Sequence, residues 1–256
     1  MEDKKYNNIQ LIFGDCLERM KEIPDRSIDM ILCDLPYGVL NKNNPNVKWD
    51  CIIPFDDMWN QYNRLIKDNR AIVLTASQPF TTALIASNMA MFKYCWVWEK
   101  PQGVDPFMAK IRPLNNYEDI VVFSKGTTRY YPQMVDGNPY KIVRDRKSRK
   151  HELTGTIMKQ TSTDNKGFRY PTRILKVKQE RGLHPTQKPV ALLEYLIKTY
   201  TDEGMLVLDN CMGSGSTGVA CVNTNRKFIG IEMDEKYFDI SCKRIEDALR
   251  EPNLFK

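Results

Sequence analysis

The sequence predicts an α/β fold, in which one doubly wound, mostly parallel sheet is interrupted by a basic insert. Short continuous apolar runs, typical of buried parallel strands, alternate with segments whose apolar residues recur at helical spacing. The alternation stops between residues 127 and 183 and resumes beyond them. With 256 residues, 42% of them hydrophobic, the chain is long enough to bury a sizeable core without disulfides or metals as scaffolding.

The elements expected before the insert follow from local pattern. Residues 55–68 carry apolar side chains at helical spacing and are expected to form an amphipathic helix. Ser77, Gln78 and Pro79 are expected to open the next helix, because proline suits the first helical turn. Strands are expected at five apolar runs, namely 9–13, 28–33, 71–76, 93–98 and 119–124.

Regular structure is expected again after the insert. Helices are expected over 189–200 and 216–225, and Asp234 can cap a last helix that runs to about residue 250. Strands are expected at 205–209 and 227–232. The expected organisation is therefore one catalytic domain made of residues 1–126 and 184–256, with residues 127–183 as the insert.

Composition narrows the class of protein. The seven cysteines are scattered and no two form Cys-x-x-Cys, so reduced thiols are expected rather than a disulfide framework. Only two histidines are present, and no metal site is expected. No apolar run approaches the roughly 20 residues that span a bilayer, and the first ten residues hold no apolar stretch of the signal-peptide kind. These features predict a cytoplasmic protein.

The net charge of +6 comes entirely from the insert. Residues 127–183 contain 14 Lys and Arg but 5 Asp and Glu, whereas the rest of the chain contains 24 and 27. This asymmetry favours a polyanionic partner that contacts the insert alone. A solvated surface segment would give the same charge pattern, so charge by itself leaves both interpretations open.

A glycine-rich turn lies between the expected strand 205–209 and the expected helix 216–225. It contains GSGSTG at 213–218, with the G-x-G-x-x-G spacing of a dinucleotide site, and Glu232 follows at the end of the next strand. Glycines let the backbone approach a nucleotide cofactor, and an acidic residue can bind ribose hydroxyls. A carboxylate at Asp209 would repel a pyrophosphate but can bind an ammonium, which favours S-adenosylmethionine over NAD.

The sequence Asp34-Leu35-Pro36-Tyr37 follows the apolar run 28–33, so it is expected at the carboxyl end of a strand, where ligands bind in such sheets. The exocyclic amine of a base is a poor nucleophile because its lone pair is delocalised into the ring. The Asp34 carboxylate and the Leu35 carbonyl can accept its two protons, while Tyr37 can stack on the base. A base in duplex DNA must first leave the stack to reach such a pocket.

Three motifs in this order resemble the β group of DNA amino-methyltransferases: DLPY at 34–37, HPTQKP at 184–189 and DNCMGSGST at 209–217. The resemblance covers about residues 9–126 and 184–250. It implies a Rossmann-like methyltransferase sheet in circularly permuted order and S-adenosylmethionine as the cofactor. It also implies that residues 127–183 are the target-recognition region.

Carried over by position, the resemblance makes Asp34, Leu35, Pro36 and Tyr37 the catalytic tetrad. It assigns to the cofactor the residues Asp15, Cys16, Thr186, Lys188, Asp209, Cys211, Gly213, Ser214, Gly215, Ser216, Thr217 and Glu232. In this set Asp15 would bond the adenine, Glu232 the ribose, and Thr186 and Lys188 would lie near the carboxylate of the methionine part. Trp49-Asp50 is similar to a Trp-Asp pair that often follows the tetrad.

Two residues depart from the family pattern. Leu35 replaces the commoner first proline, but the contact expected there uses its backbone carbonyl, so activity is still expected. Cys211 stands where an aromatic residue is usual, which is expected to loosen packing against the cofactor. An Asp at the head of the tetrad is typical of enzymes that act on adenine N6, whereas Ser is commoner in those that act on cytosine N4.

The insert is expected to bind DNA, because Lys and Arg bind phosphates and interleaved aromatic residues suit a flipped base or its gap. For any single Arg, a phosphate or solvent role is the safer assignment. The residues assigned to DNA are Lys141, Arg144, Arg146, Lys147, Arg149, Lys150, Arg169 and Arg173.

The leading expectation is an S-adenosylmethionine-dependent enzyme that methylates adenine N6 in duplex DNA by direct displacement with base flipping. Cytosine-N4 methylation is the close alternative, RNA methylation is a more distant one, and a DNA-binding protein without catalysis remains open. An NAD-dependent oxidoreductase is the alternative from another class. Carbon-5 cytosine chemistry is disfavoured, because no proline precedes a cysteine. A homodimer and a cognate restriction endonuclease are the other partners considered.

Overall fold

The computed structural model describes residues 1–38, 50–104, 106–143, 149–150, 153, 155, 157–158, 162–180 and 187–250. These form two compact units. The first comprises Met1–Tyr131 and Arg173–Lys256, and the second comprises Pro132–Thr172. In the described part of the chain, no helix is long and apolar enough to cross a membrane.

The first unit is built on a sheet whose described strands lie in the order β1-β2-β15-β14-β3-β4-β6-β5-β13. Neighbours from β2 to β4 are parallel, while β6 runs antiparallel to both β4 and β5. The bounds are β1 Lys4–Tyr6, β2 Ile9–Phe13, β3 Ile28–Asp34, β4 Ile66–Ala76, β5 Phe92–Val104, β6 Asn115–Phe123, β13 Ile174–Lys176, β14 Leu206–Asp209 and β15 Lys227–Glu232.

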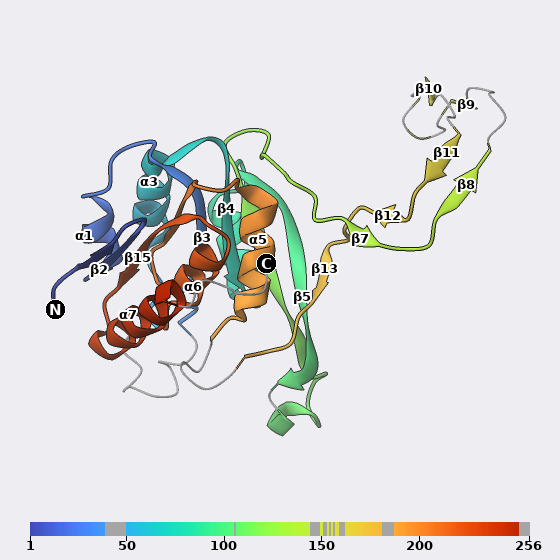
Figure 1. Cartoon of the computed structure of the whole chain (residues 1–256). Helices are drawn as coiled ribbons and strands as arrows, with labels where there is room; N and C mark the ends of the chain where they lie inside the picture. The colour runs from blue at the N-terminus through green and yellow to red at the C-terminus, as the bar shows by residue number, and fades with distance from the viewer. Residues whose placement is uncertain are drawn as a thin grey trace. The chain divides into compact units, whose positions relative to one another are not determined.

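Helices cover both faces of this sheet, as the alternation of strands and helices predicts (Figure 1). One face packs against α5, α6 and α7, and the other against α1, α3 and α4. The bounds are α1 Cys16–Met20, α3 Phe55–Leu65, α4 Phe80–Ser87, α5 Val190–Tyr200, α6 Ser216–Asn223 and α7 Glu235–Arg250, with one 3₁₀ turn, η1, at Pro106–Met108. The doubly wound, mostly parallel fold expected from the sequence is thereby confirmed.

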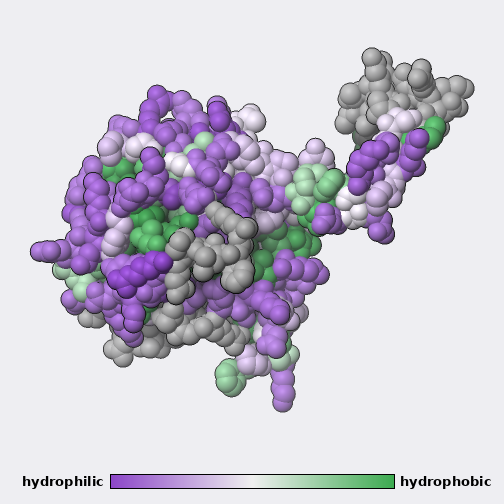
Figure 2. Space-filling model, in the orientation of Figure 1, coloured by the Kyte–Doolittle hydropathy of each residue, from purple (hydrophilic) through white to green (hydrophobic). Residues whose placement is uncertain are grey.

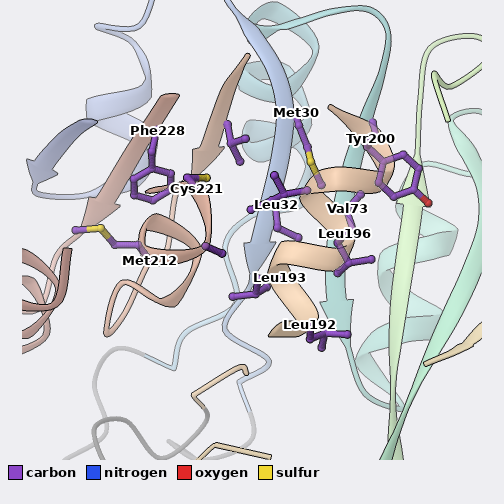
Figure 3. Close-up of a cluster of buried hydrophobic side chains, with 14 of the residues drawn as sticks. Met30, Leu32, Val73, Leu192, Leu193, Leu196, Tyr200, Met212, Cys221 and Phe228 are labelled. Atoms are coloured by element: carbon purple, nitrogen blue, oxygen red, sulfur yellow. The ribbon is translucent and has the colours of Figure 1, made fainter. Parts of the chain in front are cut away.

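The core explains the apolar runs at 28–33 in β3 and at 71–76 in β4. Both are buried on their two faces, as parallel central strands are. On one face, Leu193 and Leu196 of α5 lie beside Leu32 of β3 and Val73 of β4 (Figure 3). On the other face, the buried stripe of α3 includes Tyr62, whose side chain is fully buried.

Some element ends differ from the predictions. Helix α3 ends at Leu65 and β4 begins directly at Ile66, whereas the helix was expected to residue 68 and the strand from 71. Strands β5 and β6 form a longer hairpin than their apolar runs predict. The additional pairs lie where the strands leave the core, and a solvated antiparallel ladder needs no apolar residues to form its backbone hydrogen bonds.

The second unit consists of short antiparallel pairs: β7 Val135–Asp136 with β12 Phe168–Arg169, β8 Tyr140–Ile142 with β11 Thr163–Asn165, and β9 Arg149–Lys150 with β10 Ile157–Met158. Because the pairs are nested, the unit is a two-stranded ribbon (Figure 1). The sequence shows no periodicity here because the described β7 and β8 are exposed on both faces. The unit spans fewer residues than the insert expected at 127–183, since β13 belongs to the main sheet.

Candidate functional site

A cavity of about 1210 Å³ opens at the carboxyl ends of β3, β14 and β15, within the first unit. Its lining includes all four residues of the DLPY segment and most of the glycine-rich turn. Strands β14 and β3 are neighbours here, and the helix that follows β14 covers one face while the chain after β3 leads to α3 on the other. Ligands bind at such a switch point in open α/β sheets.

Asp34 ends β3, and its carboxylate is held by three donors. Tyr37 donates its hydroxyl to Oδ1 at 2.9 Å, and the Thr75 hydroxyl donates to the same oxygen. The Lys188 ammonium donates to Oδ2 at 2.5 Å. Each carboxylate oxygen can accept two hydrogen bonds. Of these three contacts, Oδ1 accepts two and Oδ2 accepts one, so one acceptor position stays open on Oδ2.

Lys188 also lies 3.4 Å from Oε2 of Glu118, whose Oε1 accepts a 2.5 Å hydrogen bond from Lys100. The side chains of Lys188 and Lys100 are 6% and 8% exposed, and those of Glu118 and Asp34 are 14% and 24% exposed. Burial lowers the pKa of Lys188, but the carboxylates of Asp34 and Glu118 outweigh this and raise it overall. The cluster therefore holds a charged lysine against an acceptor carboxylate.

Tyr37 remains a neutral hydrogen-bond donor. Burial raises its pKa well above the ordinary value, and the charges of Asp34 and Glu118 raise it further. Its ring stacks on Phe80 with centroids 5.0 Å apart. The chain directly after it is fixed by Asp50, which is 3% exposed and accepts the Gly38 backbone N–H at 3.0 Å. Trp49, the neighbour of Asp50 in the sequence motif, lies outside the described residues.

Asp209 ends β14 and begins the glycine-rich turn. Its Oδ2 accepts from the Thr217 hydroxyl at 2.6 Å, and its Oδ1 accepts from the Cys211 backbone N–H at 3.1 Å. Burial raises the pKa of Asp209 to about 6, although these hydrogen bonds oppose the shift. A buried carboxylate near the wall of the cavity is a favourable partner for a cationic group, as the sequence predicted for the ammonium of S-adenosylmethionine.

Glu232 ends β15 and ties the turn to the sheet. Its Oε2 accepts from the Gly213 backbone N–H and its Oε1 from the Asp234 backbone N–H, each at 2.8 Å. Burial raises its pKa, while these hydrogen bonds lower it. Glu232 lines the cavity, and it also fixes the position of Gly213.

Two glycines of the turn are required by close packing. Gly215 has a φ of +78°, and a Cβ there would lie 2.8 Å from Cβ of Ser241. At Gly218 a Cβ would lie 2.4 Å from Cδ1 of Ile245 and 2.9 Å from a ring carbon of Phe228. The third glycine of G-x-G-x-x-G thus lets α6 approach α7 and β15, as the motif predicts.

The remaining turn residues are also held from α7. Arg244 donates through Nη1 to the Ser214 carbonyl at 2.7 Å, and to the hydroxyls of Ser214 and Ser216 at 3.1 Å. The Cys211 side chain lies beside the thiols of Cys16 and Cys33, and burial raises the pKa of Cys33 to about 12. All seven cysteines are free in the structure.

Asp15 lines the cavity and is also the N-cap of α1, because its Oδ1 accepts from the backbone N–H groups of Leu17 and Glu18 at 2.9 and 3.2 Å. Thr186 lies outside the described residues. The structure thus brings together the described residues assigned from the sequence to the tetrad and the cofactor, apart from Gly215, which lies behind the lining.

Sequence reasoning missed Thr75, Lys100 and Glu118, and it did not foresee the contact between Lys188 and Asp34. Lys100 and Glu118 each stand next to another charged residue of the same strand, Glu99 and Asp119, so no local signal singles them out. Asn210 was also missed; its side-chain oxygen accepts a 2.6 Å hydrogen bond from the buried Tyr62 hydroxyl. No local signal marks Asn210 within the motif either.

The insert residues assigned to DNA are placed less uniformly. Arg169 stacks on Tyr140 with its guanidinium carbon 4.7 Å from the ring centroid, and it donates to the Asn138 carbonyl and the Asn165 side chain. These contacts hold the ribbon together. Lys141 is exposed and faces Asp164 across the ribbon.

Arg173 lies in the first unit, where it stacks on Tyr94 at 5.2 Å. Only the backbone of Arg149 and Lys150 is described, as part of β9. Arg144, Arg146 and Lys147 lie outside the described residues.

Comparisons with known proteins agree on one family. The chain is 29% identical to the type II methyltransferase M2.MboI of Moraxella bovis, over 96% of this chain and 89% of that protein. Its structure is similar to that of the M1.HpyAVI–SAM complex, with a TM-score of 0.63, 24% identity and coverage of 93% and 98% of the two chains. It is also similar to PvuII DNA methyltransferase (cytosine-N4-specific), with a TM-score of 0.65, 19% identity and coverage of 96% and 93%.

The model of the N6/N4 methyltransferase family, described as DNA methylase, matches residues 28–243. This range includes the Asp34 corner, the Lys188 contact and the whole glycine-rich turn. The match to this family excludes the alternative of an NAD-dependent oxidoreductase. The chain therefore belongs to the N6/N4 DNA methylase family, and it is an S-adenosylmethionine-dependent DNA methyltransferase.

Proposed function

We propose that the protein methylates adenine N6 in duplex DNA by direct displacement, with the target base flipped into the cavity. The observation that carries this proposal is that the carboxylates of Asp34 and Asp209 line the same cavity. Asp34 keeps an acceptor position open beside Lys188, and Asp209 lies at the base of the glycine-rich turn. The Asp at the head of the tetrad supports adenine, because this residue type is typical of adenine-N6 enzymes in the family that the sequence resembles.

The residues of the turn fit the cofactor. Asp209 can bind its ammonium and Glu232 its ribose hydroxyls, and the backbone near Gly213 admits close approach of a ligand. Asp15 can meet the adenine, and Thr186 the carboxylate of the methionine part. S-adenosylmethionine, when bound, supplies an electrophilic methyl group on its sulfonium.

The tetrad acts on the target amine. Asp34 and the Leu35 carbonyl accept its two hydrogens, which favours a more tetrahedral nitrogen with an available lone pair. Lys188 holds the Asp34 carboxylate by a direct hydrogen bond, and that carboxylate can take the proton that the nitrogen loses on methylation. Pro36 stiffens the turn, and Tyr37 holds Asp34 through its hydroxyl and presents its ring to the base.

We assign target recognition to the insert at 127–183, whose described core is the ribbon Pro132–Thr172. Its basic residues suit phosphate binding. Lys141, Arg144, Arg146, Lys147, Arg149 and Lys150 are the residues proposed for DNA contact. For Arg169 a role in holding the ribbon is better supported, because its guanidinium already has internal partners.

The type II methyltransferases among its relatives support a role in restriction–modification, with a cognate endonuclease as partner. Protection of methylated DNA from cleavage by an endonuclease encoded beside this chain tests that role. Light scattering of the purified protein tests the homodimer.

The experiment that tests the proposed function is transfer of labelled methyl groups from S-adenosylmethionine to unmethylated duplex DNA, followed by digestion to nucleosides. N6-methyladenine is the expected product. N4-methylcytosine would keep the displacement mechanism and correct the target base, while transfer to RNA alone would overturn the DNA assignment. Sequencing the methylated DNA then gives the recognition site needed for the variants below.

A further inference from the structure

The connection between β5 and β6 carries an apolar tip that no described residue of the first unit covers. Phe107 is 95% exposed and Ile111 is 75% exposed, and Leu114 is also exposed at the base. Burial of side chains of this size is favourable, because it removes a large apolar surface from water. A large aromatic side chain held almost entirely in solvent therefore calls for a partner.

The tip is an ordered turn. The 3₁₀ turn η1 places Phe107 between Pro106 and Met108, and the backbone N–H groups of Ile111 and Arg112 donate to the Met108 carbonyl at 2.8 and 2.9 Å. Below it, the pair Val104–Asn115 closes the hairpin. The apolar side chains are therefore presented from a fixed base, which lowers the entropy lost on binding.

The tip stands at the edge of the sheet where the cavity opens. Strand β5 ends at Val104 and β6 begins at Asn115, and both residues line the same cavity as Asp34 and Asp209, as does Arg112 of the tip. The same hairpin carries Lys100 and Glu118 of the cluster around Asp34. In Figure 1 the tip is the green segment beyond the arrowhead of β5.

The charge of the tip is positive. Residues 106–114 include Lys110 and Arg112, both exposed, and no Asp or Glu, although Asp105 precedes them. In the space-filling view, apolar and hydrophilic side chains project together at this end of the molecule (Figure 2). An exposed aromatic side chain flanked by cations suits duplex DNA, whose base stack accepts an apolar wedge and whose phosphates bind Lys and Arg.

We propose that Phe107 enters the base stack of duplex DNA beside the target base, while Lys110 and Arg112 bind the neighbouring phosphates. A base that leaves the stack opens a gap, and an aromatic side chain that fills this gap opposes its return. The wedge rests on the proposed function, since it requires duplex DNA as the substrate. It gives the catalytic unit its own DNA contact, separate from the insert.

The test compares wild type with Phe107→Ala and Phe107→Trp on two duplexes that contain the identified site. In one the target base is paired, and in the other it lies opposite an abasic site, where extrusion breaks no base pair. On the paired duplex Phe107→Ala is expected to lower kcat/KM by about tenfold or more, and Phe107→Trp to retain most of it. On the abasic duplex all three proteins are expected to agree within about threefold.

The matched control is Met89→Ala, which removes an apolar side chain that is 61% exposed near the opposite end of β5. It is expected to match wild type on both duplexes, and S-adenosylhomocysteine is expected to bind all variants equally. Equal rates for wild type and Phe107→Ala on the paired duplex would overturn the proposed role of Phe107 but not the proposed function. So would an equal loss on both duplexes. Absence of transfer by wild type to any DNA would overturn the proposed function itself.

Discussion

The Lys188 ammonium lies 2.5 Å from Oδ2 of Asp34, a residue 154 positions earlier in the chain. This contact joins the DLPY and HPTQKP motifs, which the sequence assigns to different roles. Glu118 and Lys100 complete the cluster from the β5–β6 hairpin. Three charged side chains with little exposure thus form a cluster beside the carboxylate that is proposed to receive the target amine.

Replacing Lys188 separates the two roles open to it. Lys188→Met leaves Asp34 and Glu118 without their shared cation, and we expect methyl transfer to fall by about 100-fold or more. S-adenosylhomocysteine affinity is expected to stay within about threefold, as isothermal titration calorimetry would measure. A loss of cofactor affinity with unchanged single-turnover rate would instead support the role at the cofactor carboxylate.

Glu118→Gln tests whether the buried cluster of charged side chains stabilises the fold. The substitution keeps the shape but removes the negative charge that holds Lys100 and Lys188. Breaking such a buried pair costs about 3–5 kcal/mol, so the free energy of unfolding in urea is expected to fall by about that amount. Lys176→Gln is the control, because its ion pair with Glu99 is largely exposed and is expected to contribute less than about 1 kcal/mol. Equal losses for the two variants would contradict a buried cluster.

Asp209→Asn is expected to stabilise the protein while it weakens cofactor binding. A folded-state pKa of about 6, against an ordinary 3.8, means that the folded protein holds this proton more tightly than the unfolded chain. The ionised group therefore destabilises the fold above about pH 6, and removing it is expected to raise the free energy of unfolding by about 1–3 kcal/mol at pH 7.5.

The same carboxyl group predicts a pH dependence of cofactor binding. As the pH falls through about 6, Asp209 becomes protonated and loses its attraction for the ammonium of S-adenosylhomocysteine. We expect calorimetric affinity in wild type to fall between pH 7.5 and 5, and affinity in Asp209→Asn to be low and flat. A parallel fall in both proteins would assign the effect to another group.

Gly218→Ala is expected to destabilise the protein by about 1–3 kcal/mol, because the new Cβ meets Ile245 and Phe228. Helix propensity alone would give a change of opposite sign, since alanine is favoured over glycine by about 1 kcal/mol. Ala86→Gly, at an exposed position of α4, measures that propensity difference in the same protein. Thermal unfolding of both variants provides the comparison, and a stabilised Gly218→Ala would show that the helix contact can relax.

The fold was predictable because its signals are local. Continuous apolar runs mark β3, β4, β14 and β15, and the glycine-rich turn marks the junction of β14 with α6. The two-stranded ribbon was not predictable, because strands exposed on both faces carry no hydrophobic alternation. Residues 174–176 were assigned to the insert because a three-residue strand is too short to show a pattern.

Those parts of the candidate site that lie within a single sequence motif were predictable. The DLPY segment and the turn from Asp209 to Thr217 each lie at one strand end, and the sheet brings these ends to one cavity. The contact between Asp34 and Lys188 depends on where the chain returns after the insert, which no local pattern specifies. Glu118 and Lys100 act through this long-range packing, so their importance became apparent only in the folded chain.

Single-turnover methyl transfer with Asp34→Asn beside wild type tests the central claim most directly, on duplex DNA containing the identified site and with S-adenosylmethionine saturating. The substitution keeps the size of the side chain but removes the charge that accepts the amine proton. We predict a rate about 100- to 10,000-fold lower, with S-adenosylhomocysteine affinity within about threefold of wild type. A variant that transfers methyl groups at the wild-type rate would contradict the assignment of Asp34 as the acceptor.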